Sequence, residues 1–336
     1  MSNIRHLLQA FARSPQATEI ISKLAAPAAR IELSGLAGAQ EAFVIAAAVL
    51  GKGAALHLVI ANSKEEAAYL QNDLAGILEG ERTVHFFPDS FKRPAFFDDL
   101  NPTQTLQRSE VINKISLLRQ EGAVVVSYPE ALFEKVVSPE TLSQHRIEVS
   151  VSEKLDVDFV ISVLVEYGFE RADFVYEPGQ FSIRGGIVDL FSFGNDLPYR
   201  IELFDDEVES IRLFDPLTQL SQKNISRVSI VPNLNTRFRQ EQKRSLLQIV
   251  PPDATVWVRD FQFLLDRLQY CFEKAEQFAQ KISGLDSAEL REIFRDRAFL
   301  YPSDVVEDIA ERSIVFLEKQ SPEVLRSFFA SPSPTR

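Results

Sequence analysis

Short apolar runs alternate with amphipathic stretches over roughly the first 140 residues. The runs at 29–33, 56–61, 83–87 and 123–127 predict buried strands, and the stretches between them predict helices. Asn62-Ser63 is a typical helix start, because Glu65 and Glu66 follow in the first turn. Strand–helix alternation of this kind is typical of a parallel sheet covered on both faces. We therefore predict an α/β domain over residues 1–143.

Between residues 144 and 232, apolar residues recur at every second position. One helix is predicted at 153–167, and several closely spaced strands follow it. Their sequences are FVY, QFSIR, GIVDLF, YRIELF, VESIRLF and RVSIV. Asp205-Asp206 predicts a hairpin turn between two of them. This pattern indicates an antiparallel α+β domain, inserted into the α/β fold.

Helices and strands return after the inserted domain. The run ATVWVRD predicts a strand, a long helix is expected from Asp260 to about Lys281, and SIVFLEK predicts one more strand. We assign residues 233–325 to a second segment of the α/β domain. Residues 326–336 form a polar tail.

The stretch QFSIRGGIVDLFSFG, residues 180–194, stands out within the inserted domain. Two alternating runs meet at Gly185-Gly186, where the backbone must bend tightly or approach another strand closely. Arg184 lies directly before these glycines, so its planar guanidinium is well placed to bind a carboxylate or a carbonyl of a partner. The alternative is an ordinary solvated arginine at a hairpin.

Composition narrows the class of protein. The chain has 336 residues, and 45% of them are hydrophobic, as in a globular protein. Its net charge of −12 argues against binding of nucleic-acid phosphates over a large surface. A protein partner is therefore favoured. Cys271 is the single cysteine, and the four histidines lack metal-ligand spacing, so no metal site is expected. No signal peptide or membrane span is evident, and we predict a cytoplasmic protein.

A phosphate-binding loop is expected between the first strand and its helix, where the sequence is GLAGAQEA. The loop starts at Gly35, but Gln40 replaces the second glycine, Glu41 the lysine and Ala42 the magnesium-binding hydroxyl of GxxxxGK[ST]. A carboxylate facing a triphosphate is repulsive. A turn without any ligand is the favoured interpretation, and no nucleotide cofactor is expected.

The second acidic motif of a helicase is also incomplete. In VWVRDFQF an acid is present at Asp260, but Phe261 and Phe263 stand where the second acid and the histidine belong. We therefore predict that this chain is not itself an enzyme. An active ATP-dependent helicase subunit is kept as the alternative.

The runs RGGIVDLF and YRIELFDDEVESIRLFDPLTQ, together with the degenerate phosphate loop, resemble the N-terminal module of bacterial transcription-repair coupling factors, the Mfd family. That module is itself similar to the excision-repair subunit UvrB. The resemblance implies a degenerate, helicase-like domain of RecA and UvrB type in two segments, with a UvrA-binding domain inserted at 144–232. It implies UvrA recruitment by mimicry of UvrB, and autoinhibition through a C-terminal domain of the full-length chain. RNA polymerase and DNA would be bound by downstream domains.

The resemblance also indicates which residues would bind UvrA. They are Arg171, from FERAD, Arg184, from the RG bend, and Phe191, from DLF; UvrB carries a further arginine where this chain has Ser182. An antiparallel strand pair could bring the two arginines onto one face. Two alternatives stay open. Arg171 could pair with Asp173 or Glu170, and Phe191 could be buried in the core.

Overall fold

A computed structural model describes residues 2–91, 101–140, 147–193, 195, 197–230, 243–281 and 299–323. The chain divides into two compact units. One comprises residues 1–104, 114–136 and 243–336, and the other comprises 105–113 and 137–242. The domain boundaries predicted at 143/144 and 232/233, and the tail at 326–336, lie outside the described residues.

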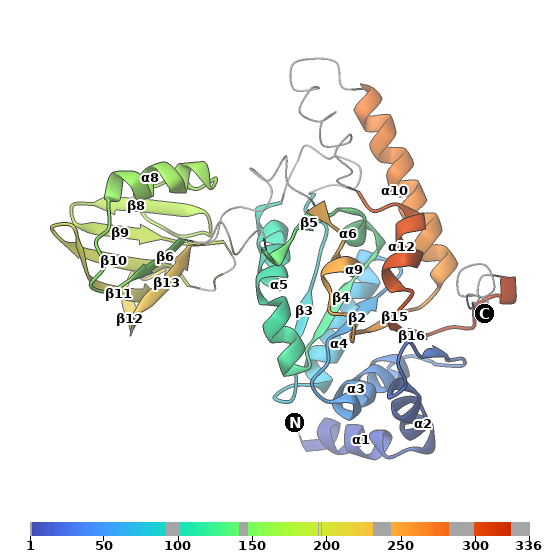
Figure 1. The fold of residues 1–336 in the computed structure, drawn as a ribbon. Coiled ribbons are helices and arrows are strands. Elements are labelled where there is room, and N and C mark those ends of the chain that lie inside the picture. Colours follow the sequence, from blue (N-terminus) through green and yellow to red (C-terminus); the bar gives the residue numbers. More distant parts are fainter. Residues whose placement is uncertain are drawn as a thin grey trace, which may run out of the picture. The chain divides into compact units, whose positions relative to one another are not determined.

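A sheet of six parallel strands forms the centre of the first unit (Figure 1). In spatial order the strands are β1 (Arg30–Glu32), β16 (Ser313–Phe316), β15 (Thr255–Val258), β2 (His57–Ile60), β4 (Val124–Ser127) and β3 (Val84–Phe86). Every residue of β2, β4, β15 and β16 is buried. Continuous burial is expected when helices cover both faces of a parallel sheet. The predicted α/β class is confirmed, and both sequence segments contribute strands to the same sheet.

Helices precede and connect these strands. They are α1 (Ser2–Ala12), α2 (Pro15–Leu24), α3 (Gln40–Lys52), α4 (Lys64–Ile77), α5 (Pro102–Glu121), α6 (Pro129–Phe133), α9 (Leu246–Ile249), α10 (Phe261–Lys281) and α12 (Pro302–Ile309). The two-residue strands β5 (Val136–Val137) and β14 (Lys243–Arg244) complete the elements of this part of the chain. Because crossovers are right-handed, the strand order places α3 and α4 on one face and α10 and α12 on the other. Ser63 caps α4 by accepting a hydrogen bond from Glu66 N at 3.2 Å, as predicted.

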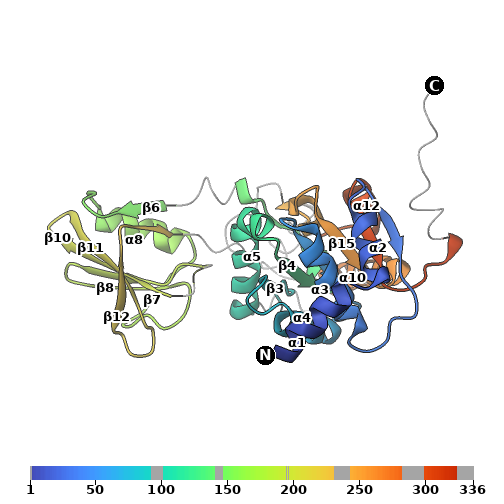
Figure 2. The same ribbon diagram turned by 90° about the horizontal axis from the view of Figure 1, so that it is seen from below.

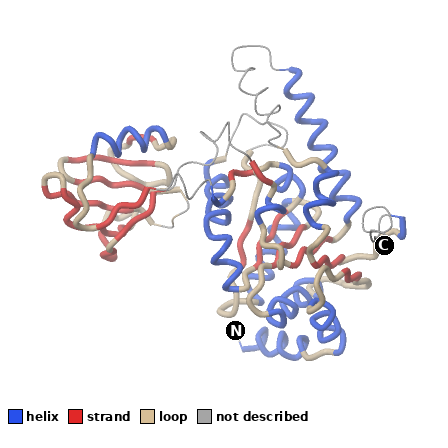
Figure 3. The backbone as a smooth tube through the Cα atoms, viewed as in Figure 1, coloured by secondary structure: helices blue, strands red, loops and turns tan. Residues whose placement is uncertain are grey.

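The second unit is mostly strand (Figure 3). Its six-stranded sheet has the order β12 (Ser221–Ile225), β11 (Glu207–Phe214), β10 (Tyr199–Phe204), β9 (Ile187–Leu190), β8 (Gln180–Arg184) and β7 (Glu170–Arg171). Neighbouring strands are antiparallel except for β7 and β8, which are parallel. The other elements described between residues 147 and 230 are helix α8 (Val157–Glu166) and an antiparallel pair, β6 (Ile147–Ser150) with β13 (Arg227–Ile230).

Alternation along the strands gives this sheet two different faces. One face packs against α8 and the β6–β13 pair and forms the main core of the unit (Figure 2). Its buried residues include Val160, Leu164, Phe181, Val188, Leu190, Ile201, Val208 and Ile211. The alternate residues Ser182, Arg184, Asp189 and Arg200 lie on the opposite face, which carries the candidate site.

Two sequence predictions in this unit need correction. Helix α8 begins at Val157 rather than at residue 153, because Asp156 caps it and Leu155 N instead donates to Asp206 O across the β10–β11 turn. The run FVY, residues 174–176, is not a strand. Gln180 Oε1 accepts hydrogen bonds from both Tyr176 N and Glu177 N, at 2.9 and 3.1 Å, and this holds the segment in a turn.

Candidate functional site

The β8–β9 hairpin positions the candidate site. Gly185 forms its turn with φ of 60°, in the left-handed region that favours glycine. Gly186 lies against the neighbouring strand, and a Cβ added there would meet Leu203 O at 2.8 Å. Leu203 N donates to Gly186 O at 2.7 Å, so the close approach is part of the sheet. The tight bend predicted from the two glycines is present, and it sets the position of Arg184 at the end of β8.

Arg184 is anchored at one side and open at the other. Its Nη2 donates to Asp189 Oδ2 at 2.6 Å, and its guanidinium lies 4.9 Å from the centre of the Phe174 ring. The side chain is nevertheless 40% exposed. A guanidinium has five N–H donors, and within the described part of the chain the structure shows a hydrogen-bond partner for Nη2 alone. Arg184 can therefore bind an external carboxylate or carbonyl without first being ordered.

Asp189 is the buried centre of this arrangement. It lies directly opposite Ser182 on β8 and opposite Arg200 on β10. Arg200 donates to it from Nε at 2.7 Å and from Nη2 at 2.9 Å, a bidentate pair. The hydrogen bond to Asp189 raises the pKa of Arg200 above its ordinary value. The two arginines together neutralise a carboxylate that would otherwise be costly to bury.

Arg171 does not share a face with Arg184. It is exposed, and it lies at the edge of the sheet in β7, opposite Phe181 in a parallel register. The Phe181 side chain is buried in the main core beneath α8, whereas Arg184 lies three residues farther along the same strand and on the other face. The antiparallel pairing expected from the sequence is therefore wrong. A single partner would have to reach around the edge of the sheet to contact both arginines.

Phe191 is buried rather than exposed. It is 5% exposed and packs with Val175 and Phe214 in a small separate core. As the structure stands, Phe191 is not a surface anchor, which is the alternative that the alternating pattern left open. Ser182 is also buried, and its hydroxyl donates to Asp173 O at 2.9 Å. The exposed aromatic side chains beside Arg184 are Phe174 and Tyr176. In the sequence these two residues stand out only as part of the predicted strand FVY.

The loop that resembles a phosphate-binding loop joins β1 to α3. Gln40 begins the helix, and its Oε1 accepts a hydrogen bond from Ala37 N at 3.0 Å. Ala42 is buried, and Glu41 forms an ion pair with Nη2 of Arg259. Arg259 directly follows β15 and also donates to Glu318 Oε1 at 3.0 Å. An arginine held between two carboxylates therefore joins the ends of three segments next to this loop.

The surroundings of Glu41 are acidic. Burial raises the pKa of Glu41 above its ordinary value despite the opposing charge of Arg259. A cavity of about 190 Å3 beside the loop is lined by Gly38, Glu41, Glu66, Tyr69, Asp73 and Arg259. Asp260, the single acid of the second helicase motif, accepts a hydrogen bond from Phe263 N at 3.0 Å in the first turn of α10. The lining of this cavity thus offers a triphosphate three carboxylates, Glu41, Glu66 and Asp73, and an already paired guanidinium.

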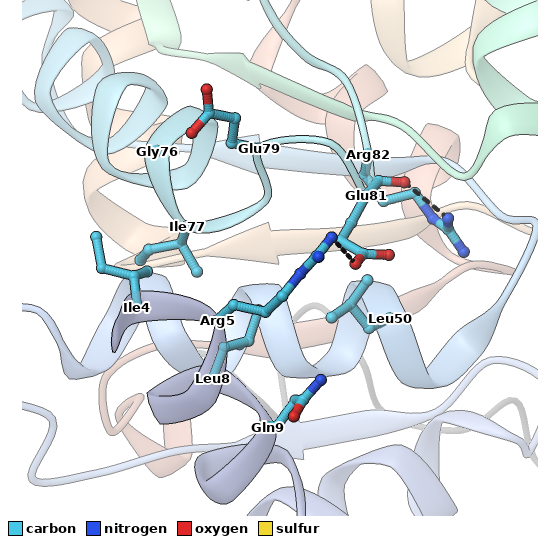
Figure 4. A pocket seen from close by; sticks show the side chains of 10 residues that line it. All are labelled: Ile4, Arg5, Leu8, Gln9, Leu50, Gly76, Ile77, Glu79, Glu81 and Arg82. Atoms are coloured by element: carbon cyan, nitrogen blue, oxygen red, sulfur yellow. Dashed lines mark hydrogen bonds and ion pairs between the residues drawn. The ribbon is translucent and has the colours of Figure 1, made fainter. Parts of the chain in front are cut away.

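A larger cavity, of about 780 Å3, lies among α1, α3, α4 and the turn after α4 (Figure 4). Apolar side chains such as Ile4, Leu8 and Ile77 line it, and Arg5 forms an ion pair with Glu81 at its side. It contains none of the residues predicted from the sequence. In the described ranges no group of three or more His, Cys, Asp or Glu residues could hold a metal ion. The helices described here are also too short or too polar to cross a membrane.

Comparison with known proteins shows which family the inserted unit resembles. Residues 147–235 match the family described as the UvrB interaction domain, and this range contains Arg171, Arg184 and Asp189. The inserted unit is thus similar to the UvrB interaction domain over these residues.

More than half of the chain is similar to transcription-repair-coupling factors. It is 32% identical to that of Bacillus subtilis (strain 168) over 217 residues, which are 64% of this chain and 18% of the relative. It is 35% identical to that of Staphylococcus aureus (strain MRSA252) over 175 residues, which are 52% of this chain and 14% of the relative. The resemblance drawn from the sequence is confirmed, and the matches span less than a fifth of these relatives.

Proposed function

We propose that the inserted unit recruits the excision-repair protein UvrA by mimicking UvrB. The observation that carries this proposal is the state of Arg184, whose guanidinium is fixed by buried Asp189 yet 40% exposed. Preorganisation of this kind lowers the entropy lost when a partner binds. The match to the UvrB interaction domain supports the choice of partner, because the resemblance implies that this domain binds UvrA.

Binding of UvrA to the purified chain and to the Arg184→Ala variant tests the proposal. Loss of an anchored arginine at the centre of an interface costs roughly 2 kcal/mol or more, so we expect at least about 30-fold weaker binding. Asp189 keeps its bidentate pair with Arg200 in this variant, so the fold should persist. Circular dichroism checks that point.

Arg227→Ala is the matched control for this experiment. Arg227 is an exposed arginine of the same unit, on β13, and it pairs with Glu148 at 3.2 Å. It lies on the strand pair that covers the other face of the sheet. The control should bind UvrA as the wild type does. Wild-type affinity in Arg184→Ala would refute the assignment of the site, and the same loss in both variants would indicate a general charge effect.

The remainder of the proposal concerns the longer protein that the relatives represent. The first unit would act as a scaffold without nucleotide hydrolysis of its own, and RNA polymerase and DNA would be bound by domains beyond this chain. A C-terminal domain of the same protein would mask the UvrA-binding surface and restrain the motor. We expect the ATPase rate of the full-length protein to rise when residues 1–336 are deleted, and an unchanged rate would refute autoinhibition.

A further inference from the structure

Four large apolar side chains lie exposed on two loops of the inserted unit. Phe174 and Tyr176 belong to the loop between β7 and β8, and they are 46% and 49% exposed. Leu217 and Leu220 belong to the turn between β11 and β12, and they are 85% and 68% exposed. A single exposed leucine needs no explanation, but a group of large apolar side chains on adjoining loops is typical of an interaction surface.

Hydrogen bonds join the two loops to each other. Gln219 Nε2 donates to Val175 O at 3.1 Å, and Arg200 Nη1 donates to Gln219 O at 3.2 Å. Beneath them, Val175 packs with Phe191 and Phe214 in the small separate core. The buried Phe191 thus supports the loop that carries Phe174 and Tyr176.

The turn at residues 215–220, which carries Leu217 and Leu220 and is called the leucine turn below, is fixed by hydrogen bonds of its own. Asp215 Oδ1 accepts hydrogen bonds from Leu217 N at 2.9 Å and Thr218 N at 2.8 Å. Asp215 N donates to Leu220 O at 3.0 Å, which closes the turn. These backbone hydrogen bonds keep the pKa of Asp215 below its ordinary value, because they stabilise the ionised carboxylate. Little conformational entropy is therefore left to lose when a partner covers the leucines.

The apolar loops are continuous with the Arg184 site. The Arg184 guanidinium lies 4.9 Å from the Phe174 ring centre, and the Phe174 and Tyr176 rings lie 6.4 Å apart. The Asp189–Arg200 pair supports both parts, because Asp189 holds Arg184 and Arg200 holds Gln219 in the leucine turn. An exposed arginine flanked by aromatic and aliphatic side chains has the composition of a protein-binding hot spot.

We infer that the UvrA-binding surface extends from Arg184 across Phe174 and Tyr176 to Leu217 and Leu220, with the leucine turn as a second anchor. This inference rests on the proposed function. The surface on UvrA that fits it presents an apolar ridge to the two loops and a carboxylate to Arg184. Arg171, on the other face of the sheet edge, lies outside this surface.

A double variant, Leu217→Ser with Leu220→Ser, tests the inference in the full chain with purified UvrA as the probe. Both side chains are exposed, so the substitutions should leave the thermal unfolding midpoint unchanged, and UvrA should bind at least about tenfold more weakly. The control is Phe159→Ser with Val165→Ser, which removes two comparably exposed apolar side chains from α8 on the other face. The control should bind UvrA within about twofold of the wild type.

The outcomes separate the inference from the proposed function. If Arg184→Ala weakens binding and the double leucine variant does not, the inference is overturned and UvrA recruitment stands. Equal weakening by the α8 control would also overturn it, because the docking surface would then lie elsewhere. If the wild-type chain does not bind UvrA, both fail. Protection of amide hydrogens at residues 215–220 on addition of UvrA provides a second measurement, and unchanged exchange there would contradict the inference.

Discussion

Arg184 Nη2 lies 2.6 Å from Oδ2 of Asp189, a carboxylate that is fully buried within the inserted unit. The same carboxylate binds Arg200 through two hydrogen bonds. Asp189 therefore has two structural roles. It is the counter-charge that allows Arg200 to be mostly buried, and it fixes the exposed arginine through which we propose that UvrA is bound.

Asp189→Asn should affect both structural roles. Removal of one partner from a buried ion pair leaves the other charge uncompensated, and we expect the free energy of unfolding to fall by about 3 kcal/mol. Arg200 stays charged when its partner is lost, because a guanidinium keeps its proton at neutral pH. Urea unfolding at pH 7 measures the change.

Asp206→Asn is the matched control for this prediction. Asp206 also pairs with a basic residue, Lys154, at 2.7 Å, but both side chains are exposed. We expect no measurable change in stability from the control. Equal stability of Asp189→Asn and the wild type would show that the buried pair contributes nothing net.

The parallel sheet could be predicted because its signal is local. β2, β4 and β15 are wholly buried and are apolar except for one terminal residue each, His57, Ser127 and Thr255, and burial on both faces favours that composition. The polar strand β12, with the sequence SQKNI, has no such signal. It forms because β11 offers a paired edge, and that depends on residues distant in the sequence.

The candidate site could be predicted only in part, for the same reason. The glycines marked the bend, and the family resemblance marked Arg184. The relative placement of Arg171 and Arg184 depends on β7 running parallel to β8, which no local pattern reveals. Alternation along the chain places Phe191 and Asp189 on the same face of the sheet. Phe191 is buried there because the loops at residues 172–179 and 215–220 pack over that face, which the alternation does not show. Phe174 becomes exposed because the Gln180 side chain holds residues 176–177 in a turn, so the run FVY does not form a strand.

The degenerate phosphate-binding loop GLAGAQEA predicts that the chain does not bind nucleotide. Titration of a fluorescent ATP analogue with magnesium should give no saturable signal, because Glu41 occupies the lysine position and Arg259 is already paired with Glu41 and Glu318. Glu41→Gln should behave in the same way, since the variant still lacks the lysine and the magnesium-binding hydroxyl. A saturable signal from either protein would favour the alternative of an active helicase subunit. An ATPase with an intact phosphate loop is the positive control.

His57 predicts how stability depends on pH. Its ring is buried in β2, and Trp257 Nε1 donates to its Nδ1 at 3.1 Å. Burial lowers the pKa of His57 from 6.5 to about 3, with help from the charges of Lys52 and Arg82. The histidine is therefore neutral in the folded protein. Its contribution to stability is present above pH 6.5 and is lost as the pH falls from 6.5 towards 3, because the unfolded chain takes up a proton that the folded chain cannot.

His57→Gln removes the titrating group and leaves a hydrogen-bond acceptor for Trp257. Between pH 7.5 and pH 5.5 the wild type should lose roughly 1.4 kcal/mol more of its free energy of unfolding than the variant does. This range stays above the isoelectric point of about 5.0, where the protein would be least soluble. Urea unfolding of both proteins at the two pH values gives the difference directly, and contributions from all other titrating groups cancel in it. Parallel losses in the two proteins would mean that His57 can be protonated in the folded state, and the Trp257 hydrogen bond would then have to break above pH 5.5.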